Sequence, residues 1–185
     1  TIASKFMHHK GLPSWDAPLS RFIRFAKSLD GQNMPVRVSV CADTALPDAD
    51  IIICATSNFG RFITPDKLKY GAIVCDMSRP SNVSEDVDRE RPDVLVIDGG
   101  VIEVPGLPSL GWNFGFDKGL AYACMSETMM LALEKHYEHT SLGSSGISLE
   151  SIMMMRRLAE KHGFQVASFK SFNRPLSEEK WQRVI

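Results

Sequence analysis

The sequence has no long hydrophobic run, since its apolar stretches fall well short of the roughly 18 residues that a membrane-spanning helix needs. It also shows no signal peptide. Neither sign of charge dominates, because 21 Lys and Arg residues stand against 22 Asp and Glu residues. Nucleic acid and anionic membrane surfaces are therefore not expected partners. Together these absences make the cytoplasm the expected location.

Cysteine pairs of the C-x-x-C type are missing too, which argues against a zinc site or a disulfide framework. Three of the four cysteines, Cys41, Cys54 and Cys75, fall in short runs that read as strands. The adjacent histidines His8 and His9 have no companion at metal-ligand spacing. We therefore expect no metal site and a reducing environment.

The composition that remains is typical of a folded globule, with 44% hydrophobic and 23% charged residues in 185. We expect residues 1–185 to form a single domain. Helices are predicted at residues 1–10, 19–29, 64–71 and 148–162. Short β-branched runs without polar alternation predict parallel strands at residues 36–41, 50–55, 72–76 and 94–98. This alternation predicts an α/β fold with a doubly wound, mostly parallel, Rossmann-like sheet that is covered on both faces.

Residues 117–134 predict one further helix, with Asp117 as its N-cap and an almost wholly apolar, buried surface. Cys124 and Glu127 lie one turn apart on this helix. Two interpretations remain open at this point. Cys124 is a core residue beside a carboxylate that reaches solvent, because free cysteine behaves as a small hydrophobe. Alternatively, it is a nucleophile with a neighbouring acid or base.

The segment from Ala123 to Leu131, with Glu134 and the tetrapeptide 161–164 after it, resembles the C-terminal third of the cyanobacterial long-chain acyl-acyl-carrier-protein reductases. Upstream segments resemble the same family, so the similarity covers most of the chain from about Cys41: residues 46–53, 64–68 and 98–101. The resemblance implies that Cys124 is the acyl-accepting nucleophile. It also implies NADPH as cofactor and, as substrate, a fatty acyl thioester on an acyl carrier protein or coenzyme A.

How Cys124 would be activated stays open in the sequence. Glu127 is near enough to orient the thiol or transfer a proton, although its ionised form would disfavour a thiolate. The predicted helix places Cys124 in the second turn, where the helix dipole has faded. His136 would lie about 18 Å further along the same helix, too far to act as a base.

Three predicted strands end in loops suited to a ligand, and ligands of open parallel sheets bind beyond the carboxyl ends of the strands. The first two loops resemble those that flank the nicotinamide in shikimate-dehydrogenase-like enzymes. The glycine pair in the third would let a flat ring approach the backbone. The predicted cofactor-binding residues are therefore small, polar or cationic: Thr56, Ser57, Asn58, Ser78, Arg79, Gly99 and Gly100.

A G-x-G-x-x-G loop between a strand and a helix is missing, as is the strand whose end handles the adenosine ribose. In the resembled family both flank the helix that matches Thr1–Lys10, so we expect this sequence to be part of a longer protein. If the protein lacks them altogether, a non-catalytic Rossmann-like binding domain is the better interpretation. A further alternative is an NAD(P)-dependent dehydrogenase of a small keto or hydroxy acid, which needs no nucleophile.

Overall fold

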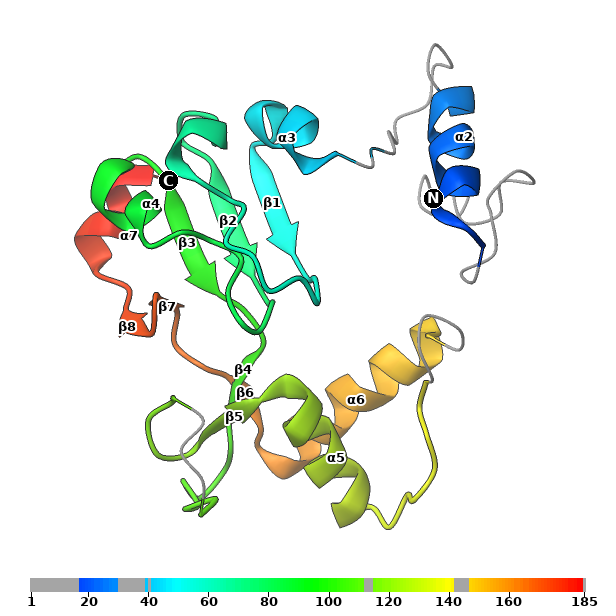
Figure 1. Ribbon diagram of the computed structural model, residues 1–185. Helices are drawn as coiled ribbons and strands as arrows, with labels where there is room; N and C mark the ends of the chain where they lie inside the picture. The colour runs from blue at the N-terminus through cyan, green and yellow to red at the C-terminus, as the bar shows by residue number, and fades with distance from the viewer. Residues whose placement is uncertain (1–16, 30–38, 40, 112–114, 142–146, 185) are drawn as a thin grey trace. The chain divides into compact units, whose positions relative to one another are not determined.

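The computed structural model describes residues 17–29, 39, 41–111, 115–141 and 147–184 (Figure 1). The chain divides into two compact units, 1–49 and 50–185. The first unit contains α2 (Leu19–Leu29), which confirms the predicted helix, and two short turns of helix, α3 (Ala42–Ala45) and η1 (Leu46–Asp48). The predicted helix at 1–10 and most of the predicted strand at 36–41 lie outside the described residues.

The second unit is built on a parallel sheet of β1 (Ile51–Cys54), β2 (Ile73–Asp76) and β3 (Leu95–Asp98), in that order (Figure 1). The strands are in register, so Cys54, Asp76 and Asp98 lie side by side at the carboxyl edge. Each strand falls within a predicted β-branched run, because such residues favour extended backbone in a buried sheet. The sheet with its helices confirms the α/β class and the Rossmann-like sheet, and consecutive strands lie side by side as in one half of a doubly wound sheet.

The two faces of this sheet differ in burial. On one face Ile52, Val74 and Val96 are at most 9% exposed. On the other face Ile51 and Ile53 are 67% and 69% exposed. Within the described residues, the expected cover of both faces is therefore incomplete at β1.

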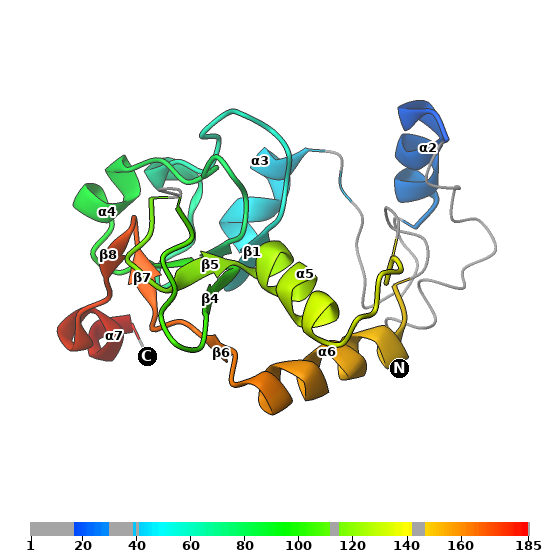
Figure 2. The same ribbon diagram turned by 90° about the horizontal axis from the view of Figure 1, so that it is seen from below.

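A second, antiparallel sheet lies beyond the carboxyl edge of the first and was not expected from the sequence. Its strands β4 (Val101–Glu103), β5 (Leu120–Tyr122) and β6 (Gln165–Val166) are ordered β5-β4-β6. Helices α5 (Ala123–Leu133) and α6 (Leu149–His162) lie side by side next to it (Figures 1 and 2). The buried residues that join these elements form one apolar cluster: Val104, Ala121, Met130 and Phe164.

Helix α6 begins and ends where the sequence predicts. The Ser148 side chain accepts a hydrogen bond from the Ser151 backbone N–H, and the Ser151 hydroxyl bonds the Ser148 backbone N–H in return. Gly163 follows the helix at φ 79°, a left-handed conformation that glycine adopts without steric cost. These local signals explain why this helix could be predicted closely.

The chain ends in a hairpin of β7 (Lys170–Ser171) and β8 (Arg174–Pro175), followed by α7 (Glu178–Val184). Helix α7 lies beside α4 (Asp86–Glu90), and Lys180 Nζ bonds Asp88 Oδ1 at 2.6 Å. None of these elements was predicted. The helix expected at 64–71 is one turn of 3-10 helix, η2 (Pro65–Lys67).

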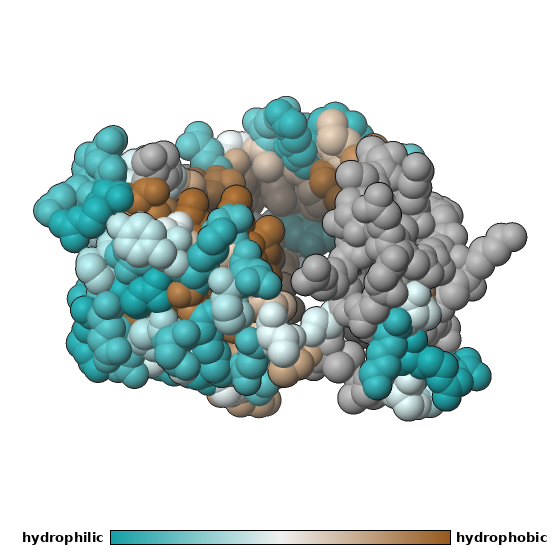
Figure 3. Space-filling view, turned by 90° about the horizontal axis from the view of Figure 1, so that it is seen from above, coloured by the Kyte–Doolittle hydropathy of each residue, from teal (hydrophilic) through white to brown (hydrophobic). Residues whose placement is uncertain are grey.

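The face drawn in Figure 3 carries many hydrophilic residues, with hydrophobic residues reaching the surface among them. Among the described residues, no helix is both long and apolar enough to cross a membrane.

Candidate functional site

The loops that follow β1 and β2 are joined by Asn82, a fully buried side chain. Its Nδ2 donates to the backbone oxygens of Asn58 and Gly60 at 2.8 and 2.9 Å, and its Oδ1 accepts from Thr56 Oγ1. Asn82 therefore sets the course of the first predicted cofactor loop. The sequence reasoning did not single out Asn82, since its partners lie more than 20 residues away.

Asp76, at the end of β2, organises the second loop. Its carboxylate is 1% exposed and accepts the backbone N–H groups of Ser78 and Asn82, both at 2.9 Å, and the Ser81 hydroxyl at 2.7 Å. An aspartate that bonds the backbone two residues on is a common turn device. These three hydrogen bonds occupy the carboxylate oxygens, so Asp76 fixes the loop and does not face a ligand.

The predicted cofactor residues of these two loops differ in exposure. Thr56, Ser57 and Asn58 are exposed, as a binding surface requires. Ser78 is 2% exposed, accepts the Thr56 backbone N–H at 3.0 Å and donates to Cys54 Sγ at 3.3 Å. The place of Ser78 is therefore behind the first loop, where it positions Thr56.

The two glycines after β3 also differ. A Cβ on Gly99 would lie 2.6 Å from Met77 Cγ and 2.9 Å from Cys75 Sγ, so Gly99 allows close internal packing. Gly100 has φ +71° and open space where its Cβ would be. Of the two glycines, only Gly100 leaves its backbone open to a flat ring, which we expected at both positions.

Helix α5 begins five residues later than the expected N-cap, Asp117, requires. Its N-cap is Tyr122, because Leu120–Tyr122 pair as strand β5 with β4. Cys124 is therefore the second residue of the helix, in the first turn, and it is exposed. The exposure contradicts the first of the two interpretations, a core cysteine, and the predicted second-turn position is wrong.

The start of α5 meets the carboxyl edge of the parallel sheet. The backbone N–H of Ala123 donates to the Gly100 oxygen at 2.9 Å, and Arg79 Nη2 donates to the Gly99 oxygen at 3.1 Å. The Arg79 guanidinium carbon lies 5.7 Å from the centre of the Tyr122 ring. The structure thus brings Arg79 and the glycine pair next to the turn that carries Cys124.

Glu127 lies one turn after Cys124, and its Oε1 accepts the Thr140 hydroxyl at 2.6 Å. Helix α5 ends at Leu133, and Lys135 at φ 57° turns the chain back. Glu127 and Thr140 consequently share a groove of about 390 Å³ with His136 and His139. The expectation that His136 lies far along the same helix is wrong, because the helix stops before it.

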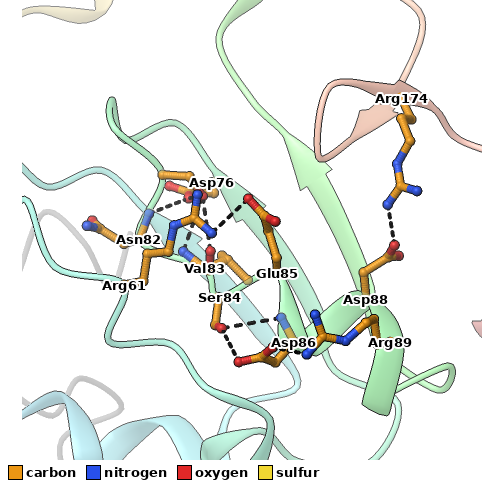
Figure 4. Close-up of polar contacts among 11 residues, drawn as sticks. Arg61, Asp76, Asn82, Val83, Ser84, Glu85, Asp86, Asp88, Arg89 and Arg174 are labelled. Atoms are coloured by element: carbon orange, nitrogen blue, oxygen red, sulfur yellow. Dashed lines mark hydrogen bonds and ion pairs between the residues drawn. The ribbon is translucent and has the colours of Figure 1, made fainter.

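A larger cleft of about 680 Å³ lies beyond the ends of β2 and β3. Its lining includes Tyr122, two residues before Cys124, and the turn of the β7–β8 hairpin. Four arginines of the described residues line it, so we call it the arginine cleft: Arg61, Arg79, Arg89 and Arg174. Figure 4 shows three of them beside carboxylates: Arg61 bonds Glu85 at 2.9 Å, Arg89 bonds Asp86 and Arg174 bonds Asp88.

Asp98 positions the wall of the arginine cleft that the hairpin forms. It accepts the backbone N–H groups of Phe172 and Asn173 at 3.2 and 2.6 Å. Both residues have positive φ, 51° and 60°, which is strained for a bulky side chain such as Phe172. Across the described residues, no cluster of three or more His, Cys, Asp or Glu side chains could hold a metal ion.

No family model matches the chain, but two known proteins are among those similar to it. Over 154 residues, or 80% of the chain, it is 34% identical to Aminotransferase PigE of Serratia sp. and covers 17% of that protein. Over 130 residues, or 66% of the chain, it is 29% identical to the long-chain acyl-[acyl-carrier-protein] reductase of Synechococcus elongatus and covers 37% of that protein. The chain thus spans less than two fifths of the length of either relative.

Both relatives are named as enzymes, which supports an enzyme here as well. The second supports a loose relationship to reductases of acyl thioesters. The chain matches only 17% of Aminotransferase PigE, so the match does not assign the aminotransferase activity to the matched part.

Proposed function

We propose that the protein reduces a fatty acyl thioester to a fatty aldehyde with NADPH, through an acyl group carried on Cys124. The observation that carries the proposal is the place of Cys124: an exposed thiol in the first turn of an 11-residue helix. That helix begins against Gly100, at the carboxyl edge where open parallel sheets bind their ligands.

The chemistry at Cys124 follows from this position. The Sγ thiolate attacks the thioester carbonyl, the bond to the carrier sulfur breaks, and the carrier leaves as a thiol after gaining a proton. Backbone N–H groups in the first turn of a helix that have no partner within the helix favour a negative charge beside them, which supports the oxyanion that forms when the carbonyl is attacked. Glu127, fixed by the Thr140 hydroxyl, is placed to move a proton one turn away.

The cofactor site would be formed by the loop after β1 and by Gly100, which follows β3. The exposed loop Thr56–Asn58 offers the Ser57 hydroxyl and the Asn58 amide, while the Thr56 hydroxyl is bonded to Asn82, and Gly100 leaves open space for a flat ring. These features fit a nicotinamide. When bound, NADPH supplies the hydride that converts the acyl group to an aldehyde and returns Cys124 to a thiolate. The similarity to the Synechococcus elongatus reductase supports the same cofactor and an acyl-acyl-carrier-protein substrate.

A dehydrogenase of small keto acids is the competing enzyme class, since the same sheet edge could serve it. That reaction needs a proton donor but no nucleophile. NADPH oxidation should therefore be measured with acyl thioesters and, separately, with small keto acids. Activity on keto acids alone would reject our proposal, and activity on neither would favour a binding domain.

The decisive variant is Cys124→Ser. It should fold normally, because the side chain is exposed, and it should lose nearly all thioester reduction, because an unactivated hydroxyl cannot replace a thiolate. Without NADPH, the wild-type protein should accumulate a covalent acyl group. Intact-protein mass spectrometry would detect the adduct, and peptide mapping would locate it.

Cys54 and Cys75 are matched controls for the mapping. Burial, the largest cause, raises the pKa of both thiols, and the Asp76 carboxylate adds to the effect. An adduct on either of them, or turnover by Cys124→Ser at the wild-type rate, would move the chemistry away from Cys124.

A further inference from the structure

The arginine cleft contains one cation that lacks a charged partner. Arg79 Nη1 donates to the backbone oxygens of Asp76 and Ser78 at 3.3 and 2.7 Å, and Nη2 donates to Gly99. No carboxylate among the described residues forms an ion pair with it. The carbonyls and the Tyr122 ring orient the guanidinium without neutralising it, and a guanidinium has five N–H donors, so two remain for a ligand.

The other three arginines of the cleft are only loosely held. The side chains of Arg61, Arg89 and Arg174 are 51%, 68% and 70% exposed, and ion pairs at such exposed positions contribute little to stability. Arg174 also shares Asp88 with Lys180, so one carboxylate faces two cations. An incoming dianion can replace these weak surface contacts with charge-assisted, bidentate hydrogen bonds.

The carboxylates of the cleft have partners other than Arg79. Glu85 pairs with Arg61, and the Asp98 carboxylate accepts the neutral Phe172 and Asn173 backbone N–H groups, which fix its direction and leave its charge in place. Asp88 is engaged by Lys180 and Arg174. The Arg79 guanidinium therefore keeps N–H donors that no printed contact of the described residues uses, at a cleft that three further arginines also line. A phosphate group matches this arrangement in charge and geometry.

The sheet order indicates which molecule, cofactor or substrate, would supply a phosphate bound in this cleft. In a doubly wound sheet, the pyrophosphate of a dinucleotide binds a glycine loop at the switch point, on the strand that would adjoin β1. The arginine cleft lies at the opposite side, beyond β2 and β3. It adjoins the Cys124 turn through Tyr122. A phosphate bound in the cleft would therefore be part of the substrate, whose reactive end reaches Cys124.

We propose that the arginine cleft binds the phosphate of a phosphopantetheine arm, whose thioester end reaches Cys124. This inference rests on the proposed thioester chemistry, because both acyl carriers, coenzyme A and acyl carrier protein, hold the acyl group on such an arm. It assigns Arg79 to the substrate instead of the cofactor role that the strand-end pattern suggested.

Binding to the full-length protein tests the cleft without any turnover. Titration calorimetry should show 4′-phosphopantetheine binding roughly tenfold or more tightly than pantetheine, which lacks the phosphate. Arg79→Gln should abolish this preference. Arg61→Gln, whose side chain is exposed and bonds only Glu85 among the described residues, should weaken it even if Arg79→Gln fails to fold.

Arg156→Gln is the matched control, since this arginine is 71% exposed and pairs with Glu160 on α6, away from the cleft. It should keep the wild-type preference for the phosphate. Raising the salt concentration should weaken the binding of phosphopantetheine but not of pantetheine. Equal affinity of wild-type protein for the two compounds, or an unchanged preference in a folded Arg79→Gln, would overturn the proposal.

Kinetics separate this inference from the proposed function. If acyl-pantetheine and acyl-phosphopantetheine are reduced equally well, the cleft proposal fails and the reductase stands. If phosphopantetheine binds through Arg79 but no thioester is reduced, the reductase fails and the cleft stands. Comparing acyl-coenzyme A with acyl-carrier protein then identifies the source of the phosphate, and Arg79→Gln should raise KM for the better of the two.

Discussion

Cys124 differs from Cys54 and Cys75 both in exposure and in backbone position. The latter two lie in strands, and burial raises the pKa of their thiols. Cys124 is exposed at the start of a helix, where the thiol can meet a substrate. The single replacement Cys124→Ser therefore tests the chemistry with little expected change in packing.

The glycine pair allows a second test on single residues. Gly99→Ala should destabilise the protein by about 1–3 kcal/mol, because its Cβ would overlap Met77 and Cys75. Gly100→Ala should cost about 1 kcal/mol through its positive φ alone, and Gly100→Asn less, because Asn tolerates that conformation. Urea unfolding measures all three.

Gly60→Ala is the control, since its Cβ would lie no nearer than 3.6 Å to another atom, Asn58 Oδ1, and its φ is not positive. Only the Gly100 variants should also weaken NADPH binding, because Gly100 is the glycine of the pair after β3 that faces open space. A Gly99→Ala protein with unchanged stability would show that the Met77 and Cys75 side chains can move aside without a cost in free energy.

Among the elements, the start of β3 is tied to η2 by Arg91 and Asp93. Arg91 donates to the backbone oxygens of Pro65, Leu68 and Lys69 at 2.6, 2.7 and 3.0 Å, and its Nη2 bonds Asp93 Oδ2 at 2.7 Å. The hydrogen bond from Arg91 is the main reason that the pKa of Asp93 is lowered to about 2. This pair links elements that are more than 20 residues apart.

The stability of this link should depend on pH. Because the folded-state pKa of Asp93 lies below the unfolded value of about 3.9, its stabilisation is complete above that pH and is lost as pH falls toward about 2. Asp93→Asn should cost about 2 kcal/mol at pH 7 and make unfolding less sensitive to acid in this range. Urea unfolding at pH 7 and pH 3 measures both effects.

Glu160→Gln is the control, because Glu160 is 64% exposed in an ion pair with Arg156. It should change the acid dependence little. If Asp93→Asn kept the full acid dependence of the wild-type protein, another carboxylate would have to carry it.

For the whole molecule, the proposed cofactor site predicts how NADPH affinity depends on a glycine loop. The loop after β1 and Gly100 are proposed to meet the nicotinamide, but a dinucleotide also needs a site for its pyrophosphate, which a glycine loop at a helix start supplies. The exposed Ile51 and Ile53 on β1 are consistent with further cover of the sheet.

Residues 1–185 alone should therefore bind NADPH weakly. A longer protein that contains the glycine loop should bind it roughly tenfold or more tightly. Titration of both forms with NADPH measures the difference. Equal affinities would mean that the missing loop does not contribute to the site.

The three parallel strands and α6 could be predicted to within about a residue. Each strand is a β-branched run that ends in a turn, and α6 carries Ser148 and Gly163 at its two ends. These signals come from neighbouring residues, so they can be recognised in the sequence without knowledge of distant contacts. The order of loops after the strands likewise pointed to the edge where Thr56, Arg79 and Gly100 lie.

What the sequence determined by itself was the α/β class, these elements and the carboxyl edge, because short-range side-chain preferences decide them. The start of α5 was decided by tertiary structure, since Leu120–Tyr122 become a strand only through pairing with β4. The groove that joins Glu127 to His136 and His139 depends on where α5 stops. The arginine cleft likewise exists only in the folded chain, because its four guanidinium groups come from segments separated by up to 113 residues, from Arg61 to Arg174, which packing alone brings together.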